Sequence, residues 1–413
     1  MRRWMIRTGL NIGSAGRLDS TRRSLGSLAL AAIALFLALW IVLPPPGYLL
    51  LLLAVGAPER SIWLLGLAVL AGGLALPDVR RSRAARIAIG LAALAMVLSS
   101  IPLLQFGGVA RRFDVTMRAA LGEHYLDEVP APVRRAMRQK PLVVADLFRG
   151  IEPAEARVTR GVPFARPDGV SLTLDIYRPP KSGQAPAVVQ IYGGAWQTGS
   201  PSANRAFARY LAAHGYAVFA IDYRHAPRWQ WPAQLADVQA ALEWVRVNGT
   251  RYGADPARLA LVGRSSGGQL ALVAAYGSGA PAVRAVVSYY GPVDLTEGYR
   301  HPPRPDPLHV RGIEEAFLGG TPEEQPLRYR EASPITYVTR PLPPTLLIYA
   351  GRDNIVEPRF GALLQRRLQE TGTTSVLLEI PWAEHGFDAI SNGPSAQLAL
   401  FETERFLAWA LHP

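Results

Sequence analysis

Ser265 lies in the segment Gly263-Arg264-Ser265-Ser266-Gly267-Gly268, which places a serine between glycines two residues away on either side. The segment follows the apolar run Leu259–Val262 and precedes a helical stretch. A sharp turn between a strand and a helix pushes the serine side chain out at the strand end, where the helix N-terminus adds positive potential. The pattern predicts that Ser265 is a nucleophile. Ser266 lacks the preceding glycine that the motif requires, and a plain Gly/Ser turn is the structural alternative.

A serine hydroxyl needs a base to accept its proton. For this motif the chain order is Ser, then Asp or Glu, then His. Only His385 and His412 lie far enough downstream of Ser265, and His412 is the penultimate residue. His385 directly follows the last apolar run, where a loop can bring it to the edge of a sheet. We therefore predict that His385 is the general base.

Asp353 follows the apolar run Thr345–Tyr349 and so stands at the carboxyl end of a predicted strand. A carboxylate there can accept the Nδ1 proton of His385, fix the tautomer and stabilise the imidazolium. Asp294, after the preceding strand, and Glu384, beside the histidine, are the alternatives. Asp353 is the predicted acid.

Backbone amides must stabilise the negative charge that develops on the substrate oxygen. The glycines of Tyr192-Gly193-Gly194 follow an early apolar run, and they leave room for amides to face a substrate. We predict donors at Gly193, Gly194 and Ser266. Trp196, Arg264 and Phe387 are tentative residues of a substrate pocket, with core packing as the alternative for the two aromatic residues.

These residues need a parallel sheet to position them. From about residue 155, short apolar runs alternate with helical stretches, and this alternation is typical of an α/β sheet covered on both faces, with its site at the carboxyl ends of the strands. The predicted strands are Ser171–Tyr177, Ala187–Tyr192, Ala217–Ile221, Leu259–Gly263, Ala285–Tyr289, Thr345–Tyr349 and Ser375–Ile380. The predicted helices cover about 202–213, 233–247, 267–276, 358–370 and 395–411.

Over about residues 165–411 the chain resembles the hormone-sensitive-lipase-like branch of the α/β-hydrolases, which includes acetyl esterases, carboxylesterases and kynurenine formamidase relatives. Five blocks match that family in order: Tyr192–Trp196, Asp222–Pro227, Pro232–Trp244, Gly263–Gly268, and Asp353 with His385-Gly386-Phe387. The resemblance implies an α/β-hydrolase fold and ester cleavage. Membrane-anchored relatives that cleave prenylcysteine methyl esters or envelope lipids are similar in layout.

Three positions depart from the family pattern. Tyr192 replaces a histidine, Ala195 replaces a third glycine, and Arg264 replaces an acidic residue beside the nucleophile. Arg264 either favours acidic substrates or forms an ion pair with a neighbouring carboxylate.

Three apolar segments occupy the N-terminal third: Leu25–Leu43, Tyr48–Leu76 and Ile87–Phe106. Because Pro58, Glu59 and Arg60 split the second segment, we place one crossing at Ser61–Leu76, and Tyr48–Ala57 lies at the membrane interface or extends that helix. The sequence predicts about three transmembrane helices over residues 1–106, a linker with amphipathic helical pieces over 107–154, and the hydrolase domain over 155–413. A cleaved signal peptide and buried core helices are the alternatives.

Basic residues indicate the topology. They precede the first segment at Arg2, Arg3, Arg7, Arg17, Arg22 and Arg23, and lie in the second connection at Arg80, Arg81, Arg83 and Arg86. Both regions should be cytoplasmic, which puts the catalytic domain outside a bacterial inner membrane. Arg111, Arg112 and Arg118 follow the third segment and favour the opposite orientation.

The net charge of +12 is uneven, with +11 in residues 1–150 and +1 in the remainder. Because the excess flanks apolar segments, it indicates membrane topology and no nucleic-acid partner. The chain has no cysteine, which excludes disulfides and thiolate chemistry. We expect no cofactor and no metal, and the oligomeric state is not indicated.

The sequence therefore predicts a membrane-anchored serine hydrolase that cleaves a small-molecule or lipid ester through an acyl-enzyme. An amidase, peptidase or formamidase and an envelope acyltransferase would use the same triad. A catalytically inert membrane interaction protein is the alternative from another class.

Overall fold

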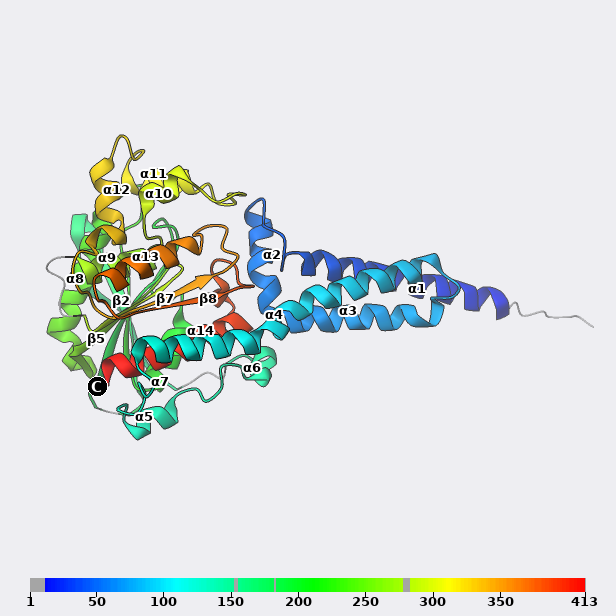
Figure 1. The fold of residues 1–413 in the computed structure, drawn as a ribbon, viewed down its shortest axis with the longest axis horizontal. Helices are drawn as coiled ribbons and strands as arrows, with labels where there is room; N and C mark the ends of the chain where they lie inside the picture. The colour runs from blue at the N-terminus through cyan, green and yellow to red at the C-terminus, as the bar shows by residue number, and fades with distance from the viewer. Residues whose placement is uncertain (1–11, 152–154, 182, 278–282, 413) are drawn as a thin grey trace, which may run out of the picture. The chain divides into compact units, whose positions relative to one another are not determined.

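The computed structural model describes residues 12–151, 155–181, 183–277 and 283–412 (Figure 1). The chain forms two compact units. One unit contains the residues up to Leu43 and Arg60–Leu104, and the other contains Pro44–Glu59 and the chain from Gln105 onward. The predicted basic residues Arg2, Arg3 and Arg7 lie outside the described residues.

The first unit is built from α1 (Ile12–Leu39), α3 (Ser61–Ala75) and the first part of α4 (Arg83–Leu121). Three helices here are long and apolar enough to cross a membrane: Asp19–Leu39, Ser61–Asp78 and Arg83–Leu121. Their buried contacts are made by alanines, among them Ala31, Ala71 and Ala92. Larger apolar side chains such as Phe36, Leu70 and Val97 are exposed. Small residues inside and large apolar residues outside are typical of helices packed in lipid.

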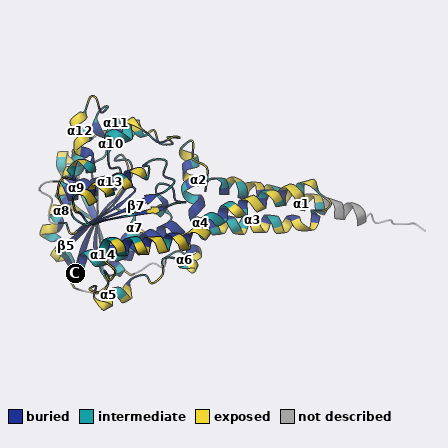
Figure 2. Cartoon of the chain, viewed as in Figure 1, coloured by how far each residue is buried: buried dark blue, intermediate teal, exposed yellow. Residues whose placement is uncertain are grey.

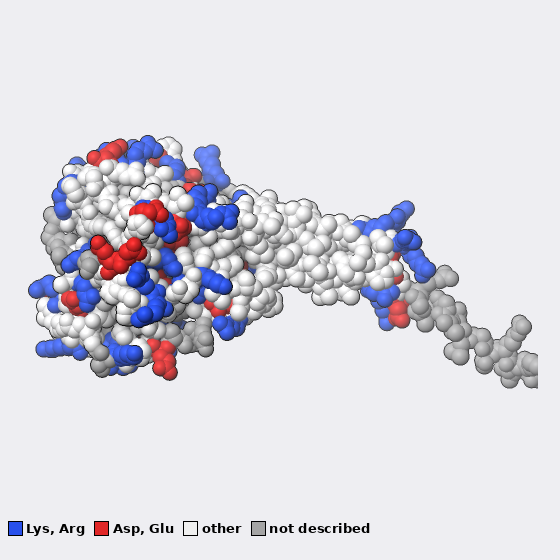
Figure 3. All heavy atoms as spheres, turned by 60° about the horizontal axis from the view of Figure 1, so that its bottom comes forward, with Lys and Arg blue, Asp and Glu red and all other residues white. Residues whose placement is uncertain are grey.

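Charged side chains gather at one end of this unit. On the face drawn in Figure 3, a long uncharged stretch of helix ends in a group of Arg and Asp side chains. Arg23 of α1 pairs with Asp78 after α3 at 2.8 Å. The start of α1 and the connection from α3 to α4 therefore lie at the same end of the helical unit.

The structure describes two N-terminal segments in more detail than the sequence predicted. Residues 48–59 form a separate helix, α2 (Tyr48–Glu59), which belongs to the second unit and packs against α14 and the short helix η5 (Phe387–Ala389). Residues 107–121 continue α4 as one helix. Phe106, Val109, Phe113 and Met117, spaced by three or four residues, are buried in the core of the second unit. The short helices α5 (Ala131–Ala136) and α6 (Val144–Arg149) follow.

The second unit contains an eight-stranded sheet in the order β1-β2-β4-β3-β5-β6-β7-β8. Strand β2 pairs antiparallel with β1 and β4, and the other pairs are parallel. The mostly parallel α/β sheet predicted from the sequence is confirmed. Its strands are β1 (Arg157–Ala165), β2 (Leu172–Arg178), β3 (Ala185–Ile191), β4 (Ala217–Ile221), β5 (Ala254–Arg264), β6 (Ala285–Tyr289), β7 (Thr345–Ala350) and β8 (Ser375–Ile380).

Helices cover both faces of this sheet, so its central strands are buried (Figures 1 and 2). These helices are α7 (Arg205–Ala213), α8 (Ala233–Asn248), α9 (Ser266–Tyr276), α13 (Arg359–Glu370) and α14 (Pro394–Leu411). Between β6 and β7 the chain forms three short helices that the sequence analysis did not anticipate: α10 (Leu295–Arg300), α11 (Val310–Leu318) and α12 (Pro326–Ala332).

Candidate active site

Ser265 occupies the turn between β5 and α9. Its backbone has φ 51° and ψ −124°, an unfavourable conformation for a residue with a side chain. Glycines on both sides make this turn possible. A Cβ atom on Gly263 would lie 2.1 Å from the carbonyl oxygen of Gly267, and one on Gly267 would lie 2.3 Å from that of Tyr192. Backbone packing thus fixes the Ser265 side chain at the carboxyl edge of the sheet.

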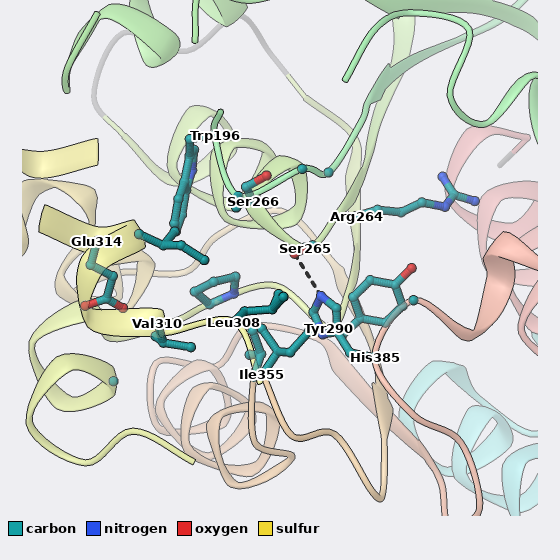
Figure 4. A pocket seen from close by; sticks show the side chains of 18 of the residues that line it. Trp196, Arg264, Ser265, Ser266, Tyr290, Leu308, Val310, Glu314, Ile355 and His385 are labelled. Carbon is teal, nitrogen blue, oxygen red and sulfur yellow. Dashed lines mark hydrogen bonds between the residues drawn. The ribbon is translucent and has the colours of Figure 1, made fainter. Parts of the chain in front are cut away.

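His385 and Asp353 lie beside Ser265 in one chain of hydrogen bonds. The Nε2 atom of His385 is 2.9 Å from the Ser265 Oγ, and its Nδ1 atom is 2.8 Å from Oδ2 of Asp353. Figure 4 shows the histidine ring directed at the serine. Asp353 follows β7 and His385 follows β8, so adjacent parallel strands deliver both side chains to the same edge. The structure thus brings together the three side chains that the sequence analysis selected.

The contacts of the carboxylates distinguish Asp353 from its alternatives. Its Oδ1 atom accepts hydrogen bonds from the backbone N–H groups of Ile355 and Val356, which leaves Oδ2 for His385. Asp294 instead caps α10 by accepting the N–H of Glu297. Glu384 accepts hydrogen bonds from Asn354 and from the backbone N–H of His385. Of these three carboxylates, Asp353 is therefore the one that is hydrogen-bonded to the imidazole.

Burial and neighbouring carboxylates act in opposite directions on the pKa of His385. Burial alone would lower it, but the charge and hydrogen bond of Asp353 outweigh burial, so the pKa is raised above 6.5. Burial, together with the charge of Asp353, raises the pKa of Glu384 to about 7. The site therefore favours an imidazolium beside Asp353, as a proton-accepting histidine requires.

The loop after β3 lies directly against the serine. Ile191 of β3 pairs with Gly263 of β5, so Gly193 and Ser265, two residues further along each chain, are neighbours. A Cβ atom on Gly193 would lie 2.7 Å from the carbonyl oxygen of Arg264 and 3.0 Å from the Ser265 Cβ. Gly194 has φ +143°, where a side chain would be strained.

Ser266 is the first residue of α9, and the first N–H groups of an α-helix have no partner within the helix. Gly193, Gly194 and Ser266 all line the cavity that contains Ser265. The three residues predicted to supply the amide donors therefore line the same cavity as the serine.

A buried polar network holds the start of this loop, and the sequence analysis did not anticipate it. The hydroxyl of Tyr192 donates to Asp222 at 2.6 Å and lies 2.8 Å from Nε2 of His225. The Tyr223 ring stacks on Tyr192, and its hydroxyl donates to the Tyr192 carbonyl oxygen. The matching blocks Tyr192–Trp196 and Asp222–Pro227 were the available signal. Their residues meet because β3 and β4 are adjacent.

A cavity of about 600 Å³ opens above Ser265 and His385. Trp196 forms part of its wall, stacked on Phe317 at 4.1 Å and bonded through Nε1 to Gln269. The opposite wall consists largely of apolar side chains: Val293, Leu308, Val310, Ile313 and Ile355. Among the residues that the structure describes, no group of three His, Asp or Glu side chains could hold a metal ion.

The structure treats two of the predicted pocket residues differently. Arg264 borders the cavity, but its guanidinium pairs with Asp388 and stacks on Phe207 and Tyr289, and Figure 4 shows it directed away from Ser265. Its charge is thus used in the ion pair that the sequence analysis offered as one alternative. The prediction that Phe387 lines the pocket is wrong. This side chain is fully buried among aromatic rings and lies outside the cavity wall.

Comparison with known proteins indicates the family to which this chain belongs. The BD-FAE family model matches residues 174–368. Esterase LipQ of Mycobacterium tuberculosis is 30% identical over 76% of this chain and 79% of its own length. The probable carboxylic ester hydrolase LipM of the same organism is 29% identical over 82% of this chain and 81% of its length. Both matches are longer than residues 155–413, so the likeness extends into the N-terminal part.

A solved structure, Thermogutta terrifontis esterase 2 phosphonylated by sarin, is 25% identical with a TM-score of 0.52, covering 61% of this chain and 94% of that one. Three observations support one assignment: the fold, the serine beside a histidine, and the length of the match to LipQ. The chain therefore belongs to the carboxylic ester hydrolase family that includes LipQ, and it is a serine carboxylesterase with an α/β-hydrolase catalytic unit.

Proposed function

We propose that Ser265, His385 and Asp353 catalyse the hydrolysis of a carboxylic ester through an acyl-enzyme. The observation that carries this proposal is the chain of two hydrogen bonds, of 2.9 and 2.8 Å, that joins the three side chains. As Oγ of Ser265 attacks the carbonyl carbon, Nε2 of His385 takes its proton, and the imidazolium then protonates the leaving alcohol. A water molecule activated by the same histidine cleaves the acyl-serine.

The amides of Gly193, Gly194 and Ser266 stabilise the oxyanion, each worth roughly 3 kcal/mol in other enzymes. Their supporting observation is the register of β3 against β5, which seats the glycine loop against the serine. A sarin adduct on a relative supports an activated nucleophile in this fold.

The test compares Ser265→Ala with Ser266→Ala. Both remove one hydroxyl, but only Ser265 contacts the histidine. We expect Ser265→Ala to lose roughly 10⁴- to 10⁶-fold in kcat on p-nitrophenyl esters, and Ser266→Ala to retain most activity because its amide stays. Faster wild-type turnover of an aryl amide than of the matching ester would contradict the ester assignment.

We further propose that the three apolar helices span a bacterial inner membrane and that the catalytic unit faces outside it. Alanine-mediated packing with exposed large apolar side chains supports a lipid environment. Arg22, Arg23 and the arginines between α3 and α4 lie at the same end of the helical unit, which supports a cytoplasmic location for that end. Three crossings then bring the catalytic unit to the opposite side.

A protease-protection assay on spheroplasts tests the topology. We expect external protease to digest the catalytic unit in intact spheroplasts. Digestion only after the membrane is permeabilised would contradict the outward orientation.

A further inference from the structure

Helix α2 carries apolar side chains on both of its sides. Its sequence, YLLLLLAVGAPE, contains no charge before its last residue. Leu51, Ala54 and Ala57 are buried, whereas Leu49 and Leu52 are 75% and 51% exposed. A helix on a water-facing surface would carry polar residues on its exposed side. The exposed leucines of α2 therefore indicate contact with an apolar phase.

One end of α2 is fastened to the catalytic unit. The carboxylate of Glu59 accepts the backbone N–H of Ser395 at 3.0 Å, in the first turn of α14. It also fills the space beside Gly393, where a Cβ atom would lie 2.0 Å from the Glu59 Oε2. Gly56 faces Ile390. This hydrogen bond and the close fit beside Gly393 fix the position of α2 on the catalytic unit.

The other end of α2 reaches the active site. Tyr48, its first residue, lines the same cavity as Ser265 and His385. The remaining wall is mostly apolar, as a site for a hydrocarbon chain requires. The first residue of α2 thus borders the cavity that contains the proposed nucleophile.

Chain connectivity keeps α2 near the membrane boundary. Only Arg60 separates α2 from α3, and eight residues separate α1 from α2. A single residue spans less than about 7 Å, so the end of α2 lies within that distance of the start of a candidate membrane span. Tyrosine and leucine at that level are typical of a helix in the membrane surface.

We propose that α2 lies in the membrane surface and forms the lipid-facing entrance of the active-site cavity, so that Ser265 receives bilayer-resident esters with long hydrocarbon chains. This inference rests on the proposed ester hydrolysis and on the membrane-spanning helices. Glu59 holds one end of α2 on the catalytic unit, and Tyr48 marks the mouth of the cavity.

The test uses the full-length protein in phosphatidylcholine–phosphatidylglycerol vesicles. Leu49→Ser/Leu52→Ser is compared with Leu327→Ser, a leucine of α12 that is 68% exposed and lies outside the cavity wall. The readout is the ratio of kcat/KM for vesicle-embedded p-nitrophenyl palmitate to that for p-nitrophenyl acetate. We expect this ratio to fall about tenfold in the α2 variant, because serine side chains at these two positions would not gain the free energy that the leucines gain by burial in lipid. The ratio should stay constant in Leu327→Ser. An unchanged ratio in the α2 variant would overturn the inference.

A second measurement does not depend on catalysis. Because the chain has no cysteine, Leu49→Cys and Leu327→Cys each provide a unique site for an environment-sensitive fluorophore. Lipids brominated on the acyl chain should quench the fluorophore at position 49 and leave that at position 327 bright. Equal quenching at both positions would overturn the membrane-surface location. Failure of the ester assignment itself would appear separately, as an inability of the wild type to hydrolyse p-nitrophenyl acetate.

Discussion

The two sides of the active-site cavity are built differently. On one side, Ser265, Asp353 and His385 follow strands of the parallel sheet, and backbone hydrogen bonds fix where each strand ends. On the other side, the short helix α11 presents apolar side chains, and Tyr48 lies at the end of α2. Under the proposed function, the sheet edge carries out the reaction and the helices select the ester. Substitutions at the sheet edge should lower turnover of every ester, whereas those in the helices should change the preference among esters.

After Ser265→Ala, the largest effect at the sheet edge is expected for Asp353→Asn. The asparagine cannot fix the histidine tautomer or stabilise the imidazolium, so kcat should fall roughly 10³- to 10⁴-fold on short and long esters alike. Glu384→Gln is the matched control, because the hydrogen bonds of Glu384 go to the backbone N–H of His385 and to Asn354 and not to the imidazole. Steady-state kinetics on a chain-length series measures both. An equal loss of kcat in Glu384→Gln would contradict the proposal that Asp353, and not Glu384, orients the histidine.

Gly193→Ala should have the next largest effect. The added methyl group would meet the Arg264 carbonyl oxygen at 2.7 Å and push the glycine loop away from the serine. Loss of one oxyanion donor costs about 10²- to 10³-fold in kcat in other enzymes. Gly312→Ala, where an added Cβ meets nothing within 4 Å, is the control. Full activity in Gly193→Ala, with an unchanged melting temperature, would argue against this loop as the donor.

The pH dependence of kcat/KM reports on the sheet edge, because it depends on the protonation of His385. His385 must be neutral to accept a proton, and Asp353 raises its pKa above 6.5. We expect kcat/KM to rise with pH through a midpoint above 6.5, falling about tenfold for each pH unit below it. Asp353→Asn removes the charge that raises this pKa most, while burial still lowers it, so the midpoint should move to lower pH. A midpoint that stays constant or moves upward in this variant would contradict the ion pair.

The smallest effect is expected on the helical side. Ile313→Ala removes apolar contact from the α11 wall, and a methylene in an apolar pocket is worth at least about tenfold in specificity where the contact is complete. Because Ile313 is only partly buried, we expect the preference for long over short esters to fall about three- to tenfold, with little change in kcat for p-nitrophenyl acetate. Leu327→Ala should leave the preference unaltered. An equal loss of kcat/KM for short and long esters would contradict the proposed difference between the two sides of the cavity.

The sheet edge was predictable from sequence because its signals are local. Continuous apolar runs mark the buried strands, and Ala217–Ile221, Ala285–Tyr289 and Ser375–Ile380 were predicted with the bounds observed. Each reactive side chain directly follows such a run, and parallel strands bring their carboxyl ends to one edge. Strand β1 was missed because it is an edge strand without a regularly buried side.

The helical side was not predictable because its helices depend on contacts distant in the sequence. Helices α10 and α12 are six and seven residues long and carry several charged residues, so no apolar periodicity marks them. Arg111, Arg112 and Asp114 made residues 107–121 resemble a linker, whereas α4 continues through them by burying Phe113 and Met117. Phe387 follows Gly386, whose φ of +75° turns the chain, and no sequence motif reveals that the ring then points into the core.

The most direct test of the sheet edge as the reactive side is the identity of the acylated residue. Acid quenching of the enzyme during turnover of p-nitrophenyl butyrate, followed by peptide mass spectrometry, should place a butyryl group on Ser265, whose Oγ lies 2.9 Å from the His385 Nε2. Fragmentation separates Ser265 from Ser266. The account predicts the adduct at residue 265 and its loss in Ser265→Ala. An adduct on any other residue, or one that persists in that variant, would contradict it.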